Sequence, residues 1–325
     1  MRRRLILGAG LIGAASATAS ISMSAGAQTF PSRPVRWVIP FPPGGNYDVT
    51  SRLVGEAMGR RLGQTVVADN RPGAGGIVGT EAAANAPADG YTVVMGSFTV
   101  QWVAPYLAGK PPLVPLFAPI SLLTTVPMVL VARSDGRFAD MKAVLAEARA
   151  KPGTVTIGHA GNGTANHLCI LRLQVNEKVQ FNVIPYKGSA PGLADLMAGQ
   201  TDLYTDQLTT SLPHIKAGKL KALLVLGPDR ISQLPDVPSL RDIGSQPFDG
   251  GTTAGLFARA GTATPILDIL NGAVVAALKE ETVSQKLVEL GAMVRPSSRE
   301  EFAAYMKDQE AGVGELVKSG LLKPE

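Results

Sequence analysis

The chain repeats a pattern in which a short apolar run is followed by a segment whose apolar residues have helical spacing. Residues 35–40 form the first apolar run. In residues 48–62 apolar side chains recur every three or four positions, and Gly63 ends the segment. Strands that alternate with helices in this way predict an α/β protein whose mainly parallel sheets have helices on both faces.

The same pattern continues to the end of the chain. The predicted strands are 35–40, 65–69, 91–96, 126–132, 154–158, 181–185, 201–206, 220–226 and 254–258. The predicted helices are 48–62, 77–85, 141–150, 164–177, 192–198, 212–217, 265–279 and one that begins near Ser298. Ser298 and Glu301 have the spacing of a capping box, which supports that last helix. The proline-rich residues 100–119 predict an irregular connection.

The strands fall into two groups, which predict two lobes. The elements after residue 250 are too few for a third domain, so we expect them to return to the first lobe. The first lobe then comprises residues 28–125 and 251–325, and the second comprises residues 126–250. The chain would cross between the lobes near Thr125 and near Gly250.

The first 27 residues have the features of an export signal. Arginines at positions 2–4 precede an uncharged, apolar segment, and Ala25-Gly26-Ala27 matches an A-x-A cleavage site. We therefore expect cleavage after Ala27 and a mature protein in the periplasm. A retained membrane anchor is the disfavoured alternative, because the segment is rich in Ala, Gly and Ser. The arginines fit either the general secretory or the twin-arginine route.

Charge and cysteine content narrow the classes of partner. Removal of residues 1–27 takes away three arginines and no acidic residue, so the net charge falls from +5 to +2. The mature chain has no cluster of Lys and Arg, and a nucleic-acid partner is not expected. Cys169 is the single cysteine, so no internal disulfide is expected. Its apolar helical surroundings predict an inert core thiol.

Four glycine-rich loops follow predicted strands, where ligands bind to parallel sheets. They read FPPGGNYD at 41–48, PGAGG at 72–76, GHAGNGTANH at 158–167 and YKGSAP at 186–191. Each leads into a predicted helix, whose first N–H groups and dipole favour an anion without help from Arg or Lys. Asp48 is expected to cap its own helix. The alternative is that these glycines only form tight turns.

The motifs of common enzymes and cofactor sites are not found in the sequence. GAGGIVG at 73–79 lacks the G-x-G-x-x-G spacing of a dinucleotide site, and neither a P-loop nor G-x-S-x-G is present. His159, His167 and His214 lack the spacing of metal ligands. No cofactor and no metal are therefore expected. His167, which lies beside Asn166, fits a ligand-binding role and a structural role equally well.

Several motifs, in order along essentially the whole mature chain, resemble one known family. They are PFPPGG with Asp48, LGQ at 62–64, NRPGAGG at 70–76 with Gly79, DGYT at 89–92, PYKGSAP at 185–191, GQ at 199–200 and LPDVP at 234–238. The chain resembles the substrate-binding proteins of tripartite tricarboxylate transporters, also called TctC-like or Bug proteins. The resemblance implies a two-lobed periplasmic binding protein of type II, which closes on its ligand like a Venus flytrap.

The resemblance also implies which residues hold a ligand carboxylate. In the first lobe these are Pro43, Gly44, Gly45, Asp48, Ala74, Gly75 and Gly76, and in the second lobe Asn162, Thr164, His167, Gly188, Ser189 and Asp206. Asn46-Tyr47 differs from the Pro-Thr that is more common in the family. Residues 161–164 and 205–207 differ too, so a shifted ligand specificity is expected.

The leading hypothesis is a monomeric receptor for a small organic anion, which is a dicarboxylate, a tricarboxylate, an acidic amino acid or a related compound. Its partners would be the membrane subunits of a tripartite transporter or a sensor protein. The alternative is a periplasmic enzyme that acts on a small carboxylate through Asp48, Asp206 or His167. A third possibility is a pure interaction protein with a vestigial cleft.

Overall fold

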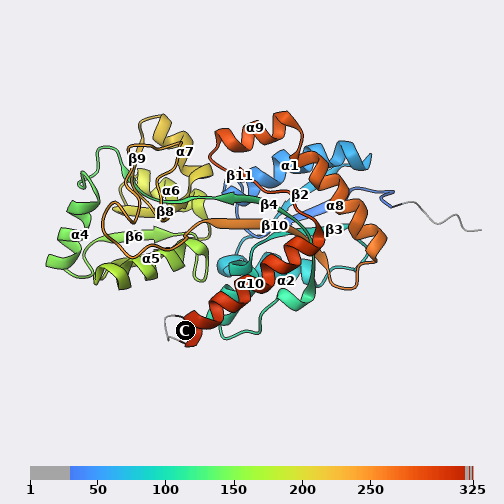
Figure 1. Ribbon diagram of the computed structural model, residues 1–325, viewed down its shortest axis with the longest axis horizontal. Helices are drawn as coiled ribbons and strands as arrows, with labels where there is room; N and C mark the ends of the chain where they lie inside the picture. The colour runs from blue at the N-terminus through green and yellow to red at the C-terminus, as the bar shows by residue number, and fades with distance from the viewer. Residues whose placement is uncertain (1–29, 319–321, 323, 325) are drawn as a thin grey trace, which may run out of the picture.

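The computed structural model describes residues 30–318, 322 and 324, which form two β-sheets flanked by helices (Figure 1). The six-stranded sheet has the order β11-β4-β10-β3-β1-β2, and the five-stranded sheet has the order β7-β6-β8-β5-β9. We call each sheet with its helices a lobe, the first being the six-stranded one. The two-lobed α/β class expected from the sequence is thus confirmed. The predicted signal peptide and its cleavage site lie outside the described residues.

The first lobe contains strands from both ends of the described chain. Its strands are β1 (Val35–Ile39), β2 (Val66–Asn70), β3 (Thr92–Gly96), β4 (Phe117–Val126), β10 (Thr252–Arg259) and β11 (Met293–Val294). Its helices are α1 (Asn46–Leu62), α2 (Ile77–Ala84), α3 (Ala104–Leu107), α8 (Thr264–Leu278), α9 (Glu281–Glu289) and α10 (Arg299–Lys318), with short helical turns at Ala74–Gly76, Thr99–Val103 and Val114–Leu116. At the start of α10, Ser298 and Glu301 exchange backbone and side-chain hydrogen bonds of 2.8 and 3.1 Å, so the predicted capping box is confirmed.

The second lobe is built from the middle of the chain. Its strands are β5 (Met128–Arg133), β6 (Thr156–His159), β7 (Asn182–Pro185), β8 (Leu203–Gln207) and β9 (Leu220–Val225). Its helices are α4 (Met141–Ala150), α5 (Ala165–Glu177), α6 (Ser189–Met197) and α7 (Leu208–Lys216). The assignment of residues 28–125 and 251–325 to one lobe and 126–250 to the other stays a prediction as to its limits.

Helices cover both faces of the first sheet, which explains the near-continuous apolar character of β1. Trp37 and Ile39 belong to a buried cluster that includes Val54 of α1 and Leu270 of α8. Val38, between them, belongs to a second buried cluster with residues of α2 and α10. A strand with helices on both sides must be apolar at successive positions, because neighbouring side chains point to opposite faces.

The sheets are mixed, whereas mainly parallel sheets were expected. The strands β1, β2 and β3 pair in parallel, as do β6, β7 and β8. The strands β4, β5, β9, β10 and β11 pair antiparallel with their neighbours. The parallel part carries the strand–loop–helix units, so the loops with ligand-binding character still gather where those strands end.

The strand β4 differs from the sequence prediction, which has an irregular connection at 100–119 and a strand only from residue 126. The apolar sequence continues from Phe117 through β5, and Pro127 alone separates the two strands. Pro119 lies inside β4, where it is opposite Phe257 at an irregularity of the pairing. Proline is tolerated in a sheet at such a bulge, where a ladder hydrogen bond is already missing.

The chain crosses between the lobes where β4 and β10 lie side by side (Figure 1). Thr125 of β4 and Thr253 of β10 are hydrogen-bonded through their side-chain oxygens at 2.8 Å. Just before β10, the Gly250 N–H donates to the Leu226 carbonyl at 3.0 Å. A Cβ atom on Gly250 would lie 2.4 Å from that oxygen, so this crossing requires glycine.

The Cys169 side chain is buried in the second lobe, and burial raises the pKa of its thiol to about 12. A thiol in this state is a poor nucleophile, which agrees with an inert core residue. Across the described part of the chain, no helix combines the length and apolar composition needed to cross a bilayer.

Candidate functional site

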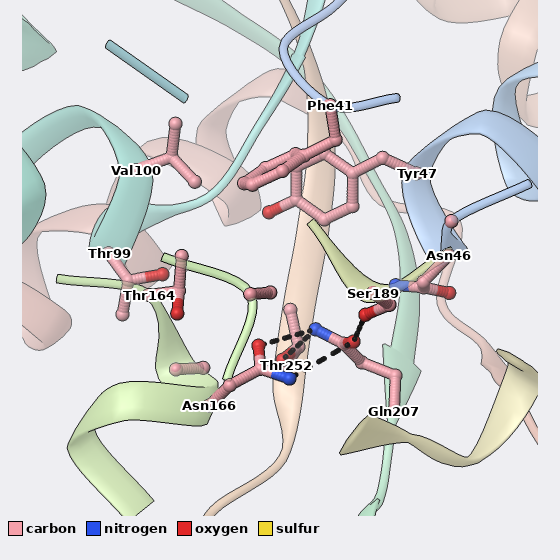
Figure 2. Close-up of a pocket in the computed structure, with 13 residues that line it drawn as sticks. Phe41, Asn46, Tyr47, Thr99, Val100, Thr164, Asn166, Ser189, Gln207 and Thr252 are labelled. Atoms are coloured by element: carbon pink, nitrogen blue, oxygen red, sulfur yellow. Dashed lines mark hydrogen bonds between the residues drawn. The ribbon is translucent and has the colours of Figure 1, made fainter. Parts of the chain in front are cut away.

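A small cavity of about 30 Å³ lies between the lobes. Its lining comes from both lobes and includes Thr252 at the start of β10 (Figure 2). The lining residues are Phe41, Gly45, Asn46, Tyr47, Thr99, Val100, Ala160, Thr164, Ala165, Asn166, Ser189, Gln207 and Thr252. We call this space the inner cavity.

The N-termini of four helices meet at the inner cavity. Gly45 precedes the first residue of α1, and Thr164 caps α5 by accepting from the His167 N–H at 3.4 Å. Ser189 begins α6, and Gln207 directly precedes α7. Unpaired N–H groups and the positive ends of these helix dipoles therefore face one small volume.

The inner cavity combines this positive field with neutral side chains. Among the described residues that line it, none has an ionisable carboxylate, ammonium or guanidinium group. Burial raises the pKa of the Tyr47 hydroxyl far above its ordinary value, so this group stays neutral. The Tyr47 ring packs edge-on against Phe41, with 5.1 Å between ring centroids. An anion here would be stabilised by backbone dipoles and neutral donors rather than by a salt bridge.

A network of hydrogen bonds lines the inner cavity and joins second-lobe residues to Thr252 of β10 in the first lobe (Figure 2). The Gln207 side chain accepts from Ser189 Oγ at 3.2 Å and donates to Asn166 Oδ1 at 3.2 Å. It also donates to Thr252 Oγ1 of β10 at 3.4 Å. Asn166 Nδ2 in turn donates to the Thr205 carbonyl at 2.8 Å. Because these groups restrain one another, the network presents donors and acceptors at fixed positions.

A second, larger space lies beside the inner cavity, and we call it the outer cavity. It has a volume of about 330 Å³, and Phe41 and Ala160 line both spaces. Its other walls include the loop residues Ala74, Gly75, Gly76 and Asn162, with Lys187 as its charged lining residue. Together the two cavities place glycine-rich loops of both lobes around one interlobe space.

The residues expected to bind a ligand fall into three groups. Gly45, Thr164 and Ser189 line the inner cavity. Ala74, Gly75, Gly76 and Asn162 line the outer cavity. Pro43, Gly44, Asp48, His167, Gly188 and Asp206 lie outside both sets of lining residues. Direct ligand contact by any of these residues stays a prediction.

The Asp48 carboxylate stabilises the loop of residues 41–48 through hydrogen bonds. It accepts from the Gly44 N–H at 2.8 Å, from Arg52 Nε at 2.9 Å and from Asn70 Nδ2 at 3.0 Å. Burial raises the pKa of Asp48, but the hydrogen bonds from Arg52, Gly44 and Asn70 outweigh it and lower the pKa overall. The expectation that Asp48 is the N-cap of α1 is therefore wrong. Asp48 is the third residue of the helix, and its side chain reaches back to the loop before it.

Asp206 is completely buried in β8, where it accepts from the Thr210 and Ser211 hydroxyls at 2.5 and 2.6 Å. Burial raises the pKa of this carboxyl group. Its partners belong to the first turn of α7, so Asp206 ties that helix to its strand.

Two of the expected glycines bring the lobes into close contact. A Cβ on Gly188 would lie 2.5 Å from Pro42 Cδ, and a Cβ on Gly75 would lie 2.3 Å from the Asn162 carbonyl oxygen. Both glycines have positive φ, 127° and 62°. These residues therefore permit the lobes to close, whatever their contact with a ligand.

Other lining residues were not predicted from the sequence. They are Phe41, Thr99, Val100, Ala160, Ala165, Asn166, Gln207 and Thr252. Thr99 and Val100 follow the end of β3, so the rule that placed the other loops also applies to them. Thr252 carries no such signal, because it reaches the cavity from a crossing strand.

In the described part of the chain, no group of three or more His, Cys, Asp and Glu side chains is arranged to hold a metal ion.

Residues 50–321 match the model of the tripartite tricarboxylate transporter family receptor. The chain belongs to this family. A solute-binding receptor of the TctC and Bug type is thereby established, as the resemblance implied.

Individual relatives support the same assignment. A protein encoded in the tcbD-tcbE intergenic region of Pseudomonas sp. (strain P51) is 37% identical, with 95% of this chain and 91% of the relative covered. The structure of the periplasmic binding protein BugD is 34% identical with a TM-score of 0.86, over 91% of this chain and 100% of that one. MatC from Rhodopseudomonas palustris, with bound malate, is 33% identical with a TM-score of 0.82, over 89% of this chain and 100% of that one. The predicted periplasmic-binding-protein fold is confirmed.

Proposed function

We propose that this chain captures a small carboxylate between its lobes. The observation that carries the proposal is the convergence of four helix N-termini on a cavity lined by neutral side chains. Helix N-termini stabilise negative charge, so this field favours an anion over a cation of the same size. The Asn166–Gln207 network adds neutral groups that can orient the ligand through directional hydrogen bonds.

The ligand class is a dicarboxylate, a tricarboxylate, an acidic amino acid or a related organic anion. The similar structure of MatC holds malate, which is a hydroxy dicarboxylate. In this chain the outer cavity shares Phe41 with the inner cavity, and it offers space and, in Lys187, a cation for a second anionic group. Ligand binding would draw the lobes together about the paired strands β4 and β10, because the cavity is complete only when both lobes contribute.

The proposed cellular role rests on family membership and on the predicted export signal. The mature receptor would act in the periplasm as a monomer, after cleavage behind Ala27. It would deliver its ligand to the membrane subunits of a tripartite transporter or report it to a sensor protein. It would need no cofactor and no metal, and it would release its ligand chemically unchanged.

The ligand class is tested on the mature chain after unfolding in guanidinium and refolding, which removes co-purified ligand. Calorimetry with malate, citrate, aspartate and succinate is compared with succinamide, an uncharged analogue of succinate. We expect saturable binding of at least one carboxylate and none of the diamide. Binding of no carboxylate, or equal binding of succinamide, would show that the proposal is wrong.

The same samples test the enzymatic alternative. NMR spectra of each bound carboxylate after prolonged incubation should be unchanged. Turnover that disappears in Asp206→Asn and His167→Ala variants would establish an enzyme instead. Export is tested separately, since the periplasmic fraction of cells that express the full chain should contain a protein that begins at Gln28.

A further inference from the structure

Asn46 of the first lobe is hydrogen-bonded to Thr209 of the second lobe. The Thr209 hydroxyl donates to Asn46 Oδ1 at 2.7 Å. Both residues are almost completely buried, with 3% and 2% of their surfaces exposed. Asn46 is the first residue of α1, and Thr209 lies in the first turn of α7. This bond therefore joins two helix N-termini that face the inner cavity from opposite lobes.

The other end of the Asn46 amide is directed into the inner cavity. Asn46 lines this cavity, and in Figure 2 its side-chain nitrogen points toward Ser189. Asn46 Nδ2 is buried and has no acceptor among the described residues. Buried donors are rarely left unpaired, because loss of hydration is costly without a replacement bond. A ligand oxygen is the acceptor that this position fits.

We infer that Asn46 determines specificity by donating to a carboxylate oxygen of the ligand, and that Thr209 orients it for this role when the lobes close. The inference rests on the proposed function, because it assigns part of carboxylate binding to the Asn46 side chain. Without the second lobe, the Asn46 amide can rotate and its donor has no fixed direction. Ligand recognition by Asn46 and closure of the lobes therefore stabilise each other.

The place of Asn46 in its helix supports a role beyond helix formation. Asn46 is the first residue of α1, and proline, which carries no amide side chain, also suits that position. Asn46 therefore adds a donor and a cross-lobe bond at a place where helix stability does not require them.

Three variants distinguish the contribution of the Asn46 side-chain nitrogen from that of its oxygen. Asn46→Asp keeps an acceptor for Thr209 but presents a charged oxygen to the ligand in place of the donor. Asn46→Pro removes both side-chain groups and also the backbone N–H of residue 46, and it remains compatible with the start of α1. Thr209→Val keeps the Asn46 donor but removes the bond that orients it. Thr201→Val is the matched control, because Thr201 is also a buried threonine of the second lobe, with no hydrogen-bond partner for its hydroxyl among the described residues.

Calorimetry with the carboxylate that binds the wild type tightest gives the affinities, and small-angle scattering gives the degree of closure. We expect Kd to rise about 100-fold or more in Asn46→Asp and about 10-fold in Asn46→Pro and Thr209→Val. In Thr209→Val the saturated protein should also be measurably less compact, whereas Thr201→Val should match the wild type. Melting temperatures exclude variants that are unfolded. Asn46→Ser replaces an Asn46 variant that fails to fold, and Thr209→Ala replaces Thr209→Val.

The outcomes distinguish this inference from the proposed function. If the wild type binds a carboxylate and folded Asn46 and Thr209 variants bind it within twofold, the inference is wrong and the proposed function stands. If affinity falls in the Asn46 variants but not in Thr209→Val, the coupling to closure is wrong. If the wild type binds no carboxylate, both proposals are wrong.

Discussion

The imidazole rings of His159 and His167 are stacked, with their centroids 4.5 Å apart and their planes 13° from parallel. Each ring accepts a backbone N–H of the loop between them through Nδ1, from Gly161 to His159 at 3.2 Å and from Gly163 to His167 at 3.3 Å. The histidines thus hold the shape of a loop that borders both cavities. An Nδ1 atom accepts a hydrogen bond only while it is unprotonated.

This arrangement predicts that acid destabilises the protein through His159. Burial, and then the proximity of His167, lower the pKa of His159 from its ordinary value of 6.5 to about 3. Between these values the unfolded chain binds a proton that the folded chain does not. The free energy of unfolding should therefore fall as the pH drops from about 6.5 toward 3, by up to about 1.4 kcal/mol per pH unit from this group.

Urea unfolding of the wild type, His159→Gln and His214→Gln across this pH range measures the effect. The variant at His159 should be less stable at neutral pH but should show a shallower pH dependence. His214, which is part-exposed in α7, serves as the control, and its variant should follow the wild type. Equal slopes in all three proteins would contradict the assignment to His159.

Asp48 is predicted to contribute more to stability than Arg52, its ion-pair partner. Asp48→Ala removes the acceptor of the Gly44 N–H and one of the two acceptors of Asn70 Nδ2, which keeps the Phe41 carbonyl. This should cost roughly 2–3 kcal/mol of unfolding free energy. The Arg52 side chain is 52% exposed, so Arg52→Ala should cost only about 0–1 kcal/mol. Urea unfolding at neutral pH gives both values, and an equal loss in the two variants would show that the ion pair dominates.

Much of the fold could be predicted because the apolar pattern matches the strand–loop–helix units closely. Helix α4 covers the expected residues 141–150, and Gly63 ends α1 in the left-handed conformation. The pairing direction of the crossing strands could not be predicted, because the strand period is the same in parallel and antiparallel sheets. The break at Pro127 was missed since apolar residues continue on both sides of it.

The candidate site was predicted at the level of loops, but less well at the level of side chains. The strand-end rule places Gly45, Thr164 and Ser189 at the inner cavity. It does not reveal where a side chain points, and Asp206 turns toward the first turn of α7 while its neighbour Gln207 lines the cavity. Adjacent strand residues face opposite sides, so a shift of one position exchanges a residue that lines the cavity for one that faces away from it.

Closure of the lobes is predicted to require that residue 75 has no side chain. Gly75→Ala would place a Cβ 2.3 Å from the Asn162 carbonyl oxygen of the other lobe, which keeps the lobes apart. Gly63→Ala is a matched control, because Gly63 has a φ of 64° against 62° for Gly75 and no atom within 4 Å of its added Cβ. Both variants should lose about 1 kcal/mol of stability from backbone strain.

Only Gly75→Ala should also bind the carboxylate ligand more weakly, with a Kd about 10-fold or more above that of the wild type. In small-angle scattering it should remain extended when ligand is added. Each variant is compared with the wild type at ligand concentrations well above its own Kd. A compact, tightly binding Gly75→Ala protein would show that the contact between these loops yields without hindering closure.

A negative charge at Gln207 should prevent anion binding by the inner cavity. Gln207→Glu keeps the size of the side chain, and it places a carboxylate beside the space that the helix N-termini surround. Two like charges in a buried site repel strongly, so Kd for the carboxylate ligand should rise about 100-fold or more at pH 8. Burial favours the neutral form of the new glutamic acid, so part of the affinity should return at pH 5, relative to the wild type at the same pH.

Gln246→Glu is the control, because Gln246 is an exposed residue of the second lobe. This variant should bind the ligand like the wild type at both pH values in calorimetry. Unchanged binding by Gln207→Glu at pH 8 would mean that the ligand lies elsewhere.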